Sequence, residues 1–224
     1  PGIILSHAIA SITDARGQIR IPEWRPKGSP TTSIRKALDD LPIAAGENTP
    51  VIDMDWGEEG LTPQERVWAW NSFSVLAMTS GIPDHPQNAI QHEAIAYCQL
   101  RFIVGTEIEE IIPALNRHLQ SKGLNMVDVT NGDGAAFPAT RLDPDHPWVK
   151  WIAAAIERTT GSPPAILPNL GGSLPNHLFA HNLGLPTIWI PHSYSGCSQH
   201  APNEHILQST TREALGVMAG LFWD

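Results

Sequence analysis

This sequence is short of cysteine, of basic residues and of long apolar runs, and each shortage excludes a class of protein. Two cysteines, Cys98 and Cys197, cannot form the disulfide framework of a small secreted domain, so we expect a reducing compartment and a cytoplasmic protein. The chain has 14 basic and 23 acidic residues, and its net charge of −9 argues against nucleic-acid binding. No apolar run approaches the roughly 18 residues that span a bilayer, which argues against a membrane protein.

The chain also lacks an initiating methionine and a signal-like segment, which leads us to expect a fragment or a processed piece. Its composition, 42% hydrophobic and 17% charged, is typical of a folded globular protein and not of a disordered one. A length of 224 residues is enough for one large domain or two small ones.

The first 140 residues carry the pattern of helices packed on an antiparallel sheet, an α+β arrangement. The apolar spacing and turn signals predict helices at 3–12, 33–41, after Thr62 and at 106–120, and strands at 18–21, 73–78, 94–104 and 125–129. Thr62 and Glu65 have the spacing of a capping box, and so do Thr106 and Glu109. Pro113 is expected to kink the last of these helices or to shift its start.

From residue 143 the pattern changes to alternating helices and short apolar strands, which is typical of an α/β domain. It predicts helices at 148–160, from the loop at 171–173 to about 182, and at 206–223, with strands at 165–167 and 187–190. This part is too short to form a doubly wound sheet alone. We therefore expect an antiparallel-sheet domain over 1–140, followed by a partial α/β domain over 141–224.

The loop at 191–204 is a candidate site because it joins a predicted strand to a predicted helix, where α/β folds place their chemistry. The imidazole of His200 can bind a metal through one nitrogen while a second residue holds the other. The alternative is that His200 caps a helix or faces solvent. Glu204 suits a helix start. Cys197 is interpreted as a buried thiol and not as a nucleophile or ligand.

The sequence contains two further candidate sites, both for binding an anion. The glycine pair Gly171 and Gly172, followed by Ser173, allows close approach of the backbone, and amides at a following helix start favour an anion; the alternative is a plain tight turn. Arg101 lies in an otherwise apolar strand, where it either faces the solvated side of the sheet or grips an anion. The acidic cluster at 53–59 fits no calcium-loop spacing and is interpreted as a solvated loop.

Several of these stretches together resemble one enzyme family. The run at 13–22, the Gly-Gly-Ser-Leu-Pro at 171–175 and the His-Ala-Pro-Asn-Glu at 200–204 are similar to the zinc metallopeptidase and deacylase family of acetylornithine deacetylase, succinyl-diaminopimelate desuccinylase, glutamate carboxypeptidase and carnosinase. The resemblance covers essentially the whole chain. It implies a lid, or dimerisation, domain over 1–140 and the C-terminal segment of the catalytic domain over 141–224, without the N-terminal catalytic half.

The resemblance also implies roles for particular residues. His200 corresponds to the last ligand of a two-zinc site, in which cobalt or manganese can replace zinc, and Gly172 and Ser173 correspond to residues that touch the substrate's carboxylate end. Asn88 and Arg101, thirteen positions apart, resemble lid residues that reach into the partner subunit's active site, although Gln91 stands where the family usually has proline. The catalytic residues themselves correspond to positions outside this chain, so none is assigned.

The resemblance thus implies a metal-dependent hydrolase that cleaves an amide or peptide bond in a small peptide or N-acyl amino acid, and that forms a homodimer through its lid. It does not separate peptidase, deacylase and carbamoyl-hydrolase activities. The chain of 224 residues alone is expected to be inactive. The alternative is a non-catalytic dimerisation or binding module that keeps the fold without the chemistry.

Overall fold

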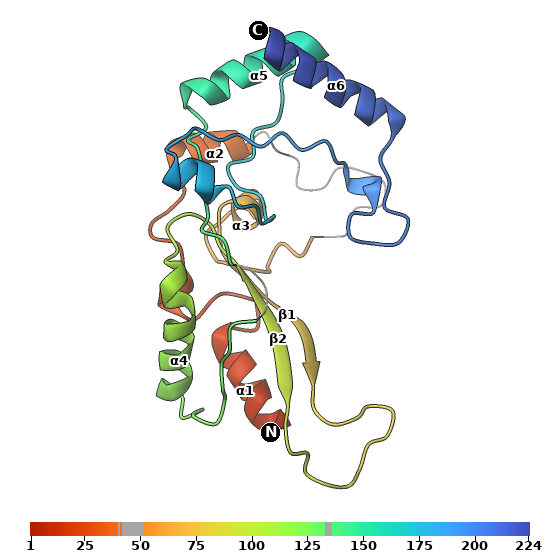
Figure 1. Ribbon diagram of the computed structural model, residues 1–224. Coiled ribbons are helices and arrows are strands. Elements are labelled where there is room, and N and C mark those ends of the chain that lie inside the picture. Colours follow the sequence, from red (N-terminus) through yellow and green to blue (C-terminus); the bar gives the residue numbers. More distant parts are fainter. Residues whose placement is uncertain (40, 42–51, 133–135) are drawn as a thin grey trace.

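A computed structural model describes residues 1–39, 41, 52–132 and 136–224. Its regular elements are α1 (Gly2–Ile12), η1 (Pro22–Trp24), α2 (Thr32–Asp39), α3 (Pro63–Trp68), β1 (Ser72–Thr79), β2 (Ile95–Arg101), η2 (Ile108–Glu110), α4 (Ile111–Ser121), α5 (Pro147–Thr160), η3 (Leu178–Asn182), η4 (Ser195–Cys197) and α6 (Gln208–Trp223). In Figure 1, α1, α4 and the two strands form the lower part, and α5 and α6 form the upper part. The expected fold class is confirmed: helices accompany a small antiparallel sheet, and a partial α/β segment follows.

The sheet consists of one antiparallel pair among the described residues. Ser72 pairs with Arg101 at one end of the ribbon and Thr79 pairs with Ile95 at the other, with an irregularity between Val75 and Ala77. The predicted strands at 73–78 and 94–104 are therefore confirmed. Those at 18–21 and 125–129 were wrong as strands, because the first makes only the isolated bridge Thr13–Ile19 and the second pairs with no described strand.

The main core lies between α1, α4 and the segment that joins α1 to η1. Its buried members are Ile12, Ile19, Ile21, Trp24 and Ala114. The indole nitrogen of Trp24 donates a hydrogen bond to the carbonyl oxygen of Ile111 at 2.9 Å, and its ring lies 5.7 Å from that of Phe73. Trp24 therefore connects α4 to the sheet.

Asn71 joins the same region to the end of β2. Its buried amide nitrogen donates to the carbonyl oxygen of Trp24 and to the hydroxyl of Thr106, both at 2.7 Å. Its amide oxygen accepts the backbone N–H of Ile103 at 2.8 Å. One side chain thus satisfies polar groups from two segments, at Trp24 and at 103–106, that are far apart in the sequence.

Two predicted helix starts had different outcomes. The capping box at Thr62 is confirmed, because the Thr62 hydroxyl accepts the Glu65 N–H at 3.2 Å and the Glu65 carboxylate accepts the Thr62 N–H at 2.8 Å. The box at Thr106 was wrong: α4 begins at Ile111, after the short 3-10 turn η2. Pro113 explains the shift, because proline is tolerated only in a helix's first turn, where its missing N–H needs no partner.

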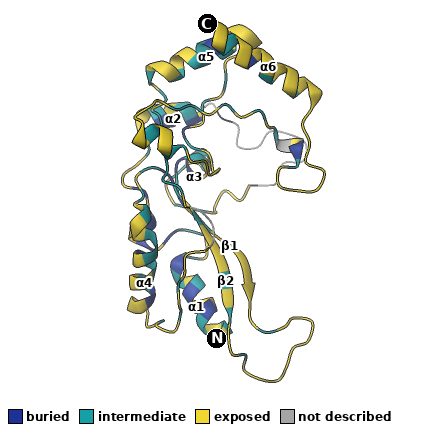
Figure 2. Ribbon diagram, viewed as in Figure 1, coloured by how far each residue is buried: buried dark blue, intermediate teal, exposed yellow. Residues whose placement is uncertain are grey.

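The C-terminal part has helices but no paired strands among the described residues. The helix α5 is confirmed, ending at Gly161 in the left-handed conformation, and it packs against α6, which begins at Gln208 instead of 206. The segments 165–167 and 187–190 do not form strands, since no described strand lies beside them to complete a ladder. Figure 2 shows much of this part exposed. No helix within the described ranges is both long and apolar enough to cross a bilayer.

Candidate functional site

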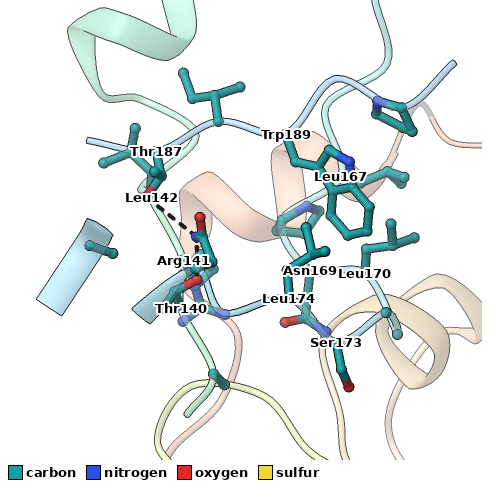
Figure 3. A pocket seen from close by; sticks show the side chains of 18 of the residues that line it. Thr140, Arg141, Leu142, Leu167, Asn169, Leu170, Ser173, Leu174, Thr187 and Trp189 are labelled. Carbon is teal, nitrogen blue, oxygen red and sulfur yellow. Dashed lines mark hydrogen bonds between the residues drawn. The ribbon is translucent and has the colours of Figure 1, made fainter. Parts of the chain in front are cut away.

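A cavity of about 1170 Å³ lies where the end of β2 meets the C-terminal segment. Besides β2, its walls come mainly from the loop segments at 136–142, 164–174 and 184–193. Residues of α5 and α6 complete them, together with a few others such as Asn176 and His181. The walls combine apolar groups with a few polar side chains, which is the usual composition of a small-molecule site. Figure 3 shows Arg141, Thr140 and Thr187 on one side of this cavity, and Ser173, Leu170 and Trp189 on the other.

The structure brings Arg101 to the glycine loop of its own chain. Its Nη1 donates a hydrogen bond to the carbonyl oxygen of Gly171 at 3.1 Å, across 70 residues of sequence, and its Nε donates to the side-chain oxygen of Gln99 at 3.0 Å. A Cβ on Gly171 would lie 3.0 Å from that Nη1, so only glycine permits this approach without movement. Two residues singled out separately in the sequence thus belong to one wall of the cavity.

Gly172 packs closely against Trp189. A Cβ at this position would lie 3.1 Å from the ring, so a larger residue would require the indole or the loop to shift. Ser173 is exposed and lines the cavity. The expectation of a helix start here was wrong, because the next regular structure is the five-residue π-helical turn η3 (Leu178–Asn182). Anion binding at this loop therefore cannot rely on a helix dipole.

A polar brace that the sequence did not indicate holds the opposite wall. The amide nitrogen of Asn176 donates to the hydroxyl of Thr140 at 2.7 Å and to that of Thr187 at 3.3 Å. Figure 3 shows Thr140 and Thr187 on this wall. Three segments are joined by one side chain. The sequence carries no signal for it, since Thr and Asn have no periodic pattern here.

Arg141 lies next to this brace and lines the same cavity. Its side chain is partly buried, and this burial lowers the pKa of the guanidinium, although Asp143 acts in the opposite direction. Asp143 is not close enough for an ion pair, and within the described ranges no acceptor or carboxylate partners the Arg141 side chain. Sequence reasoning missed Arg141 because a lone arginine in a loop carries no pattern.

His200 lies in a tight loop and faces solvent. Its backbone is in the left-handed region, with a φ of 61°, and Ser198 and Asn203 share that conformation. Its N–H donates to the carboxylate of Glu204 at 3.3 Å, so Glu204 closes the loop and does not begin α6. Cys197 is buried at the base of the loop, where its carbonyl oxygen accepts the N–H of His205 at 3.0 Å.

The residues present do not fit a zinc centre by themselves. Zinc needs three or four protein ligands, and the described part of the chain contains no group of three histidine, cysteine, aspartate or glutamate side chains that could hold a metal ion. In the acidic cluster, Glu58 is instead an ion-pair partner of Arg25 at 3.4 Å. Within its described residues, this chain therefore supplies fewer side chains than a zinc centre needs.

Asn88 is not brought to this cavity by its own chain. It lies in the exposed loop beyond the Thr79–Ile95 end of the ribbon, whereas Arg101 is at the other end. A strand of seven residues separates the two ends by about 20 Å. The pair that sequence spacing joined is thus split between opposite ends of the ribbon.

The fold is similar to that of solved metallopeptidases. An M20 family metallo-carboxypeptidase, Sso-CP2 from Sulfolobus solfataricus, matches with a TM-score of 0.75 and 20% identity over 98% of this chain and 51% of that one. The di-peptidase Dug1p from Saccharomyces cerevisiae matches with a TM-score of 0.69 and 19% identity over 97% and 47% of the two chains. Human carnosine dipeptidase 1 matches with a TM-score of 0.68 and 17% identity over 99% and 48%.

The chain therefore spans about half the length of these solved structures and has the fold of the corresponding part of M20 metallopeptidases. No protein-family model matches the sequence, and no curated protein sequence matches it either. At these identities the likeness concerns the fold, and the chemistry has to be argued from the site.

Proposed function

We propose that this chain is part of a metal-dependent hydrolase that cleaves an amide or peptide bond in a small carboxylate-bearing substrate, either a peptide or an N-acyl amino acid. The observation that carries the proposal is the contact of Arg101 with Gly171, which sets a guanidinium beside a Gly-Gly-Ser loop in a cavity. The fold of carboxypeptidases and dipeptidases supports it. In this scheme residues 1–140 are the lid and residues 141–224 belong to the catalytic domain.

Arg101 is proposed to bind the carboxylate of the substrate. One of its terminal nitrogens is used by Gly171, and its other terminal nitrogen has no partner among the described residues. A guanidinium held on two sides keeps its orientation, which favours a charge-assisted bond to a carboxylate. The hydroxyl of Ser173 and the amides of the loop can donate to the same group. Because Arg101 touches its own chain's loop, we assign it to its own cavity and not to a partner's.

Zinc is the proposed metal, with cobalt or manganese as substitutes, and His200 is its proposed ligand in this chain. The other ligands, and the group that activates water, would come from chain outside these 224 residues. Bound metal would supply an activated water and polarise the carbonyl. What this chain contributes is the orientation of the substrate's carboxylate end, and no residue here is assigned a catalytic role.

The lid is proposed to form a homodimer. Both strands of the β1–β2 ribbon are largely exposed, and unpaired strand edges favour addition of a second chain. A second copy also offers a role to Asn88, since the length of the ribbon separates the loop that contains Asn88 from Arg101 of the same chain. Sedimentation velocity tests this: a monomer at every concentration would contradict the proposal.

The experiment for the main proposal is Arg101→Ala in the full-length protein. Arg101 is exposed in this chain, and a hydrogen bond to a charged group contributes about 1.5–3 kcal/mol, so activity on N-acyl amino acids should fall by about tenfold to a hundredfold. Metal content should stay unchanged. Arg16→Ala, at an exposed loop arginine, is the matched control. Unchanged kinetics in the Arg101 variant across a panel of substrates would exclude this role.

Two measurements distinguish the proposed hydrolase from the alternative, a non-catalytic dimerisation or binding module. The full-length protein should hydrolyse amides and lose this activity on chelation, whereas a binding module would do neither. Residues 1–224 alone should show no turnover and no tight zinc, because three or four ligands are needed and this chain supplies one. Two tightly bound zinc ions on this chain would contradict the ligand assignment.

A further inference from the structure

The cavity contains a second arginine that the proposed function does not use. Its charged or titratable lining side chains are Arg101, Arg141, Glu213, His146, His181, His192, Tyr97 and Cys98. Glu213 is the sole carboxylate among the described lining residues, and it forms an ion pair with neither arginine. The cavity therefore holds two fixed positive charges and one negative charge, in a protein whose net charge is −9.

Arg141 needs an anion more than Arg101 does. A partly buried charge without a partner loses hydration, and no hydrogen bond or ion pair compensates for this loss. Such charges are therefore normally paired in proteins. Burial lowers the pKa of Arg141, yet no described residue accepts a hydrogen bond from its side chain. Arg101, in contrast, has two neutral acceptors, the Gly171 carbonyl and the Gln99 amide.

The position of Arg141 is defined by its surroundings. Thr140, the residue before it, is held by Asn176, which also holds Thr187. Figure 3 shows Arg141 on the side of the cavity away from Ser173 and Trp189. The Gly-Gly-Ser loop that Arg101 touches and the Arg141 side chain thus line different parts of one cavity.

We propose that Arg141 is a second anion-binding residue of this cavity, and that the substrate is therefore a dicarboxylate, with one carboxylate at Arg101 and the other at Arg141. This inference rests on the proposed function for the Arg101 end. It narrows the substrate to N-acyl acidic amino acids or peptides with an acidic residue. Binding needs no covalent step, so it can be tested without turnover.

The test compares N-acetyl-L-glutamate with N-acetyl-L-glutamine, which have nearly the same shape but two carboxylates and one. Binding to the full-length protein is measured by calorimetry or by competition. The wild-type protein should prefer the glutamate by about tenfold or more, since a hydrogen bond to a charged group contributes that much. Arg141→Gln should abolish the preference by weakening only the glutamate, and Arg101→Gln should weaken both ligands. Arg16→Gln, with the same change of charge, should alter neither.

Each outcome has a distinct meaning. A wild-type protein without preference, or an Arg141→Gln variant that weakens both ligands equally, would overturn the inference and leave the Arg101 site intact. An Arg101→Gln variant without effect on either ligand would overturn the proposed function instead. Far-ultraviolet circular dichroism and the Arg141→Lys variant control for misfolding: the lysine should keep part of the preference. A loss of stability in Arg141→Gln without any change of preference would show that Arg141 pairs with the protein's own acidic group.

Discussion

Residues 1–124 and residues 141–224 differ in how far they bury their apolar side chains. The first region has two buried clusters, one around Trp24 and one around Leu38. In the second region Ala155, Cys197 and Val217 are the buried apolar side chains among the described residues. There, Trp189 is 50% exposed and Trp223 is 91% exposed. The first region therefore has buried cores of its own that can stabilise its fold. The helices of the second region bury apolar side chains on one face at most.

The difference follows from the kind of sheet that each region uses. An antiparallel ribbon closes within one segment, so β1 and β2 find each other through a local hairpin. Strands of an α/β sheet pair with neighbours that are distant in the sequence. The segments 165–167 and 187–190 lack such neighbours among the described residues. The cavity lies at the border of the two regions, so its geometry depends on both.

Separating the two regions should have the largest effect. Residues 1–140 alone should unfold in one cooperative transition, because the clusters around Trp24 and Leu38 lie entirely within them. Residues 141–224 alone should show no cooperative transition, since an exposed apolar face without a core gives no unique packing. Urea denaturation followed by circular dichroism checks this. Cooperative unfolding of residues 141–224 would contradict the statement that only the first region forms a core of its own.

Trp24→Ala should produce the next largest effect. Removing a fully buried tryptophan side chain costs about 3–5 kcal/mol, and Trp24 is 2% exposed. Trp223→Ala in α6 is the matched control and should change the free energy of unfolding by less than about 0.5 kcal/mol. Both are measured by chemical denaturation. Equal losses in the two variants would show that Trp223 is covered in solution.

Asn71→Ala and Asn176→Ala compare two polar braces. Removing the Asn71 amide leaves the Trp24 carbonyl and the Ile103 N–H buried without partners, so the loss should be about 2–3 kcal/mol. Asn176 is only partly buried and its partners are hydroxyls that water can reach, so about 1 kcal/mol is expected. Thermal denaturation measures both. The reverse order would mean that the C-terminal region is the better packed of the two.

Asp14→Asn should have the smallest effect, and one that depends on pH. The pKa of Asp14 is lowered by the hydrogen bond from the Gln18 N–H, assisted by that from the Arg16 N–H. A carboxyl group whose pKa falls on folding stabilises the fold above its unfolded value, and this contribution is lost as the pH falls through the folded value. The difference in Tm between wild type and variant should therefore shrink from about pH 7 to about pH 2. A difference that is constant with pH would contradict the assignment.

Local signals in the sequence were good predictors of local structure. The apolar spacing of 3–12, the capping box of Thr62 with Glu65, and the glycine stop at Gly161 each depend on residues within one or two turns, and each is confirmed. The capping box predicted at Thr106 does not form, because the Thr106 hydroxyl accepts a hydrogen bond from Asn71, 35 residues away. Pro113 also favours a later helix start. The strands predicted at 165–167 and 187–190 do not form, because no described strand lies beside them to pair with.

The sequence by itself determined most of the helices, the two strands of the ribbon and the residue types that an anion site requires, because capping, periodicity and turn chemistry act over a few residues. Tertiary structure alone decided that Arg101 meets Gly171 and that Asn88 lies at the opposite end of the ribbon. It alone showed that Arg141, beside the brace of Asn176, has no hydrogen-bond or ion-pair partner among the described residues. Burial and long-range hydrogen bonds depend on how the chain returns on itself, which no local pattern encodes.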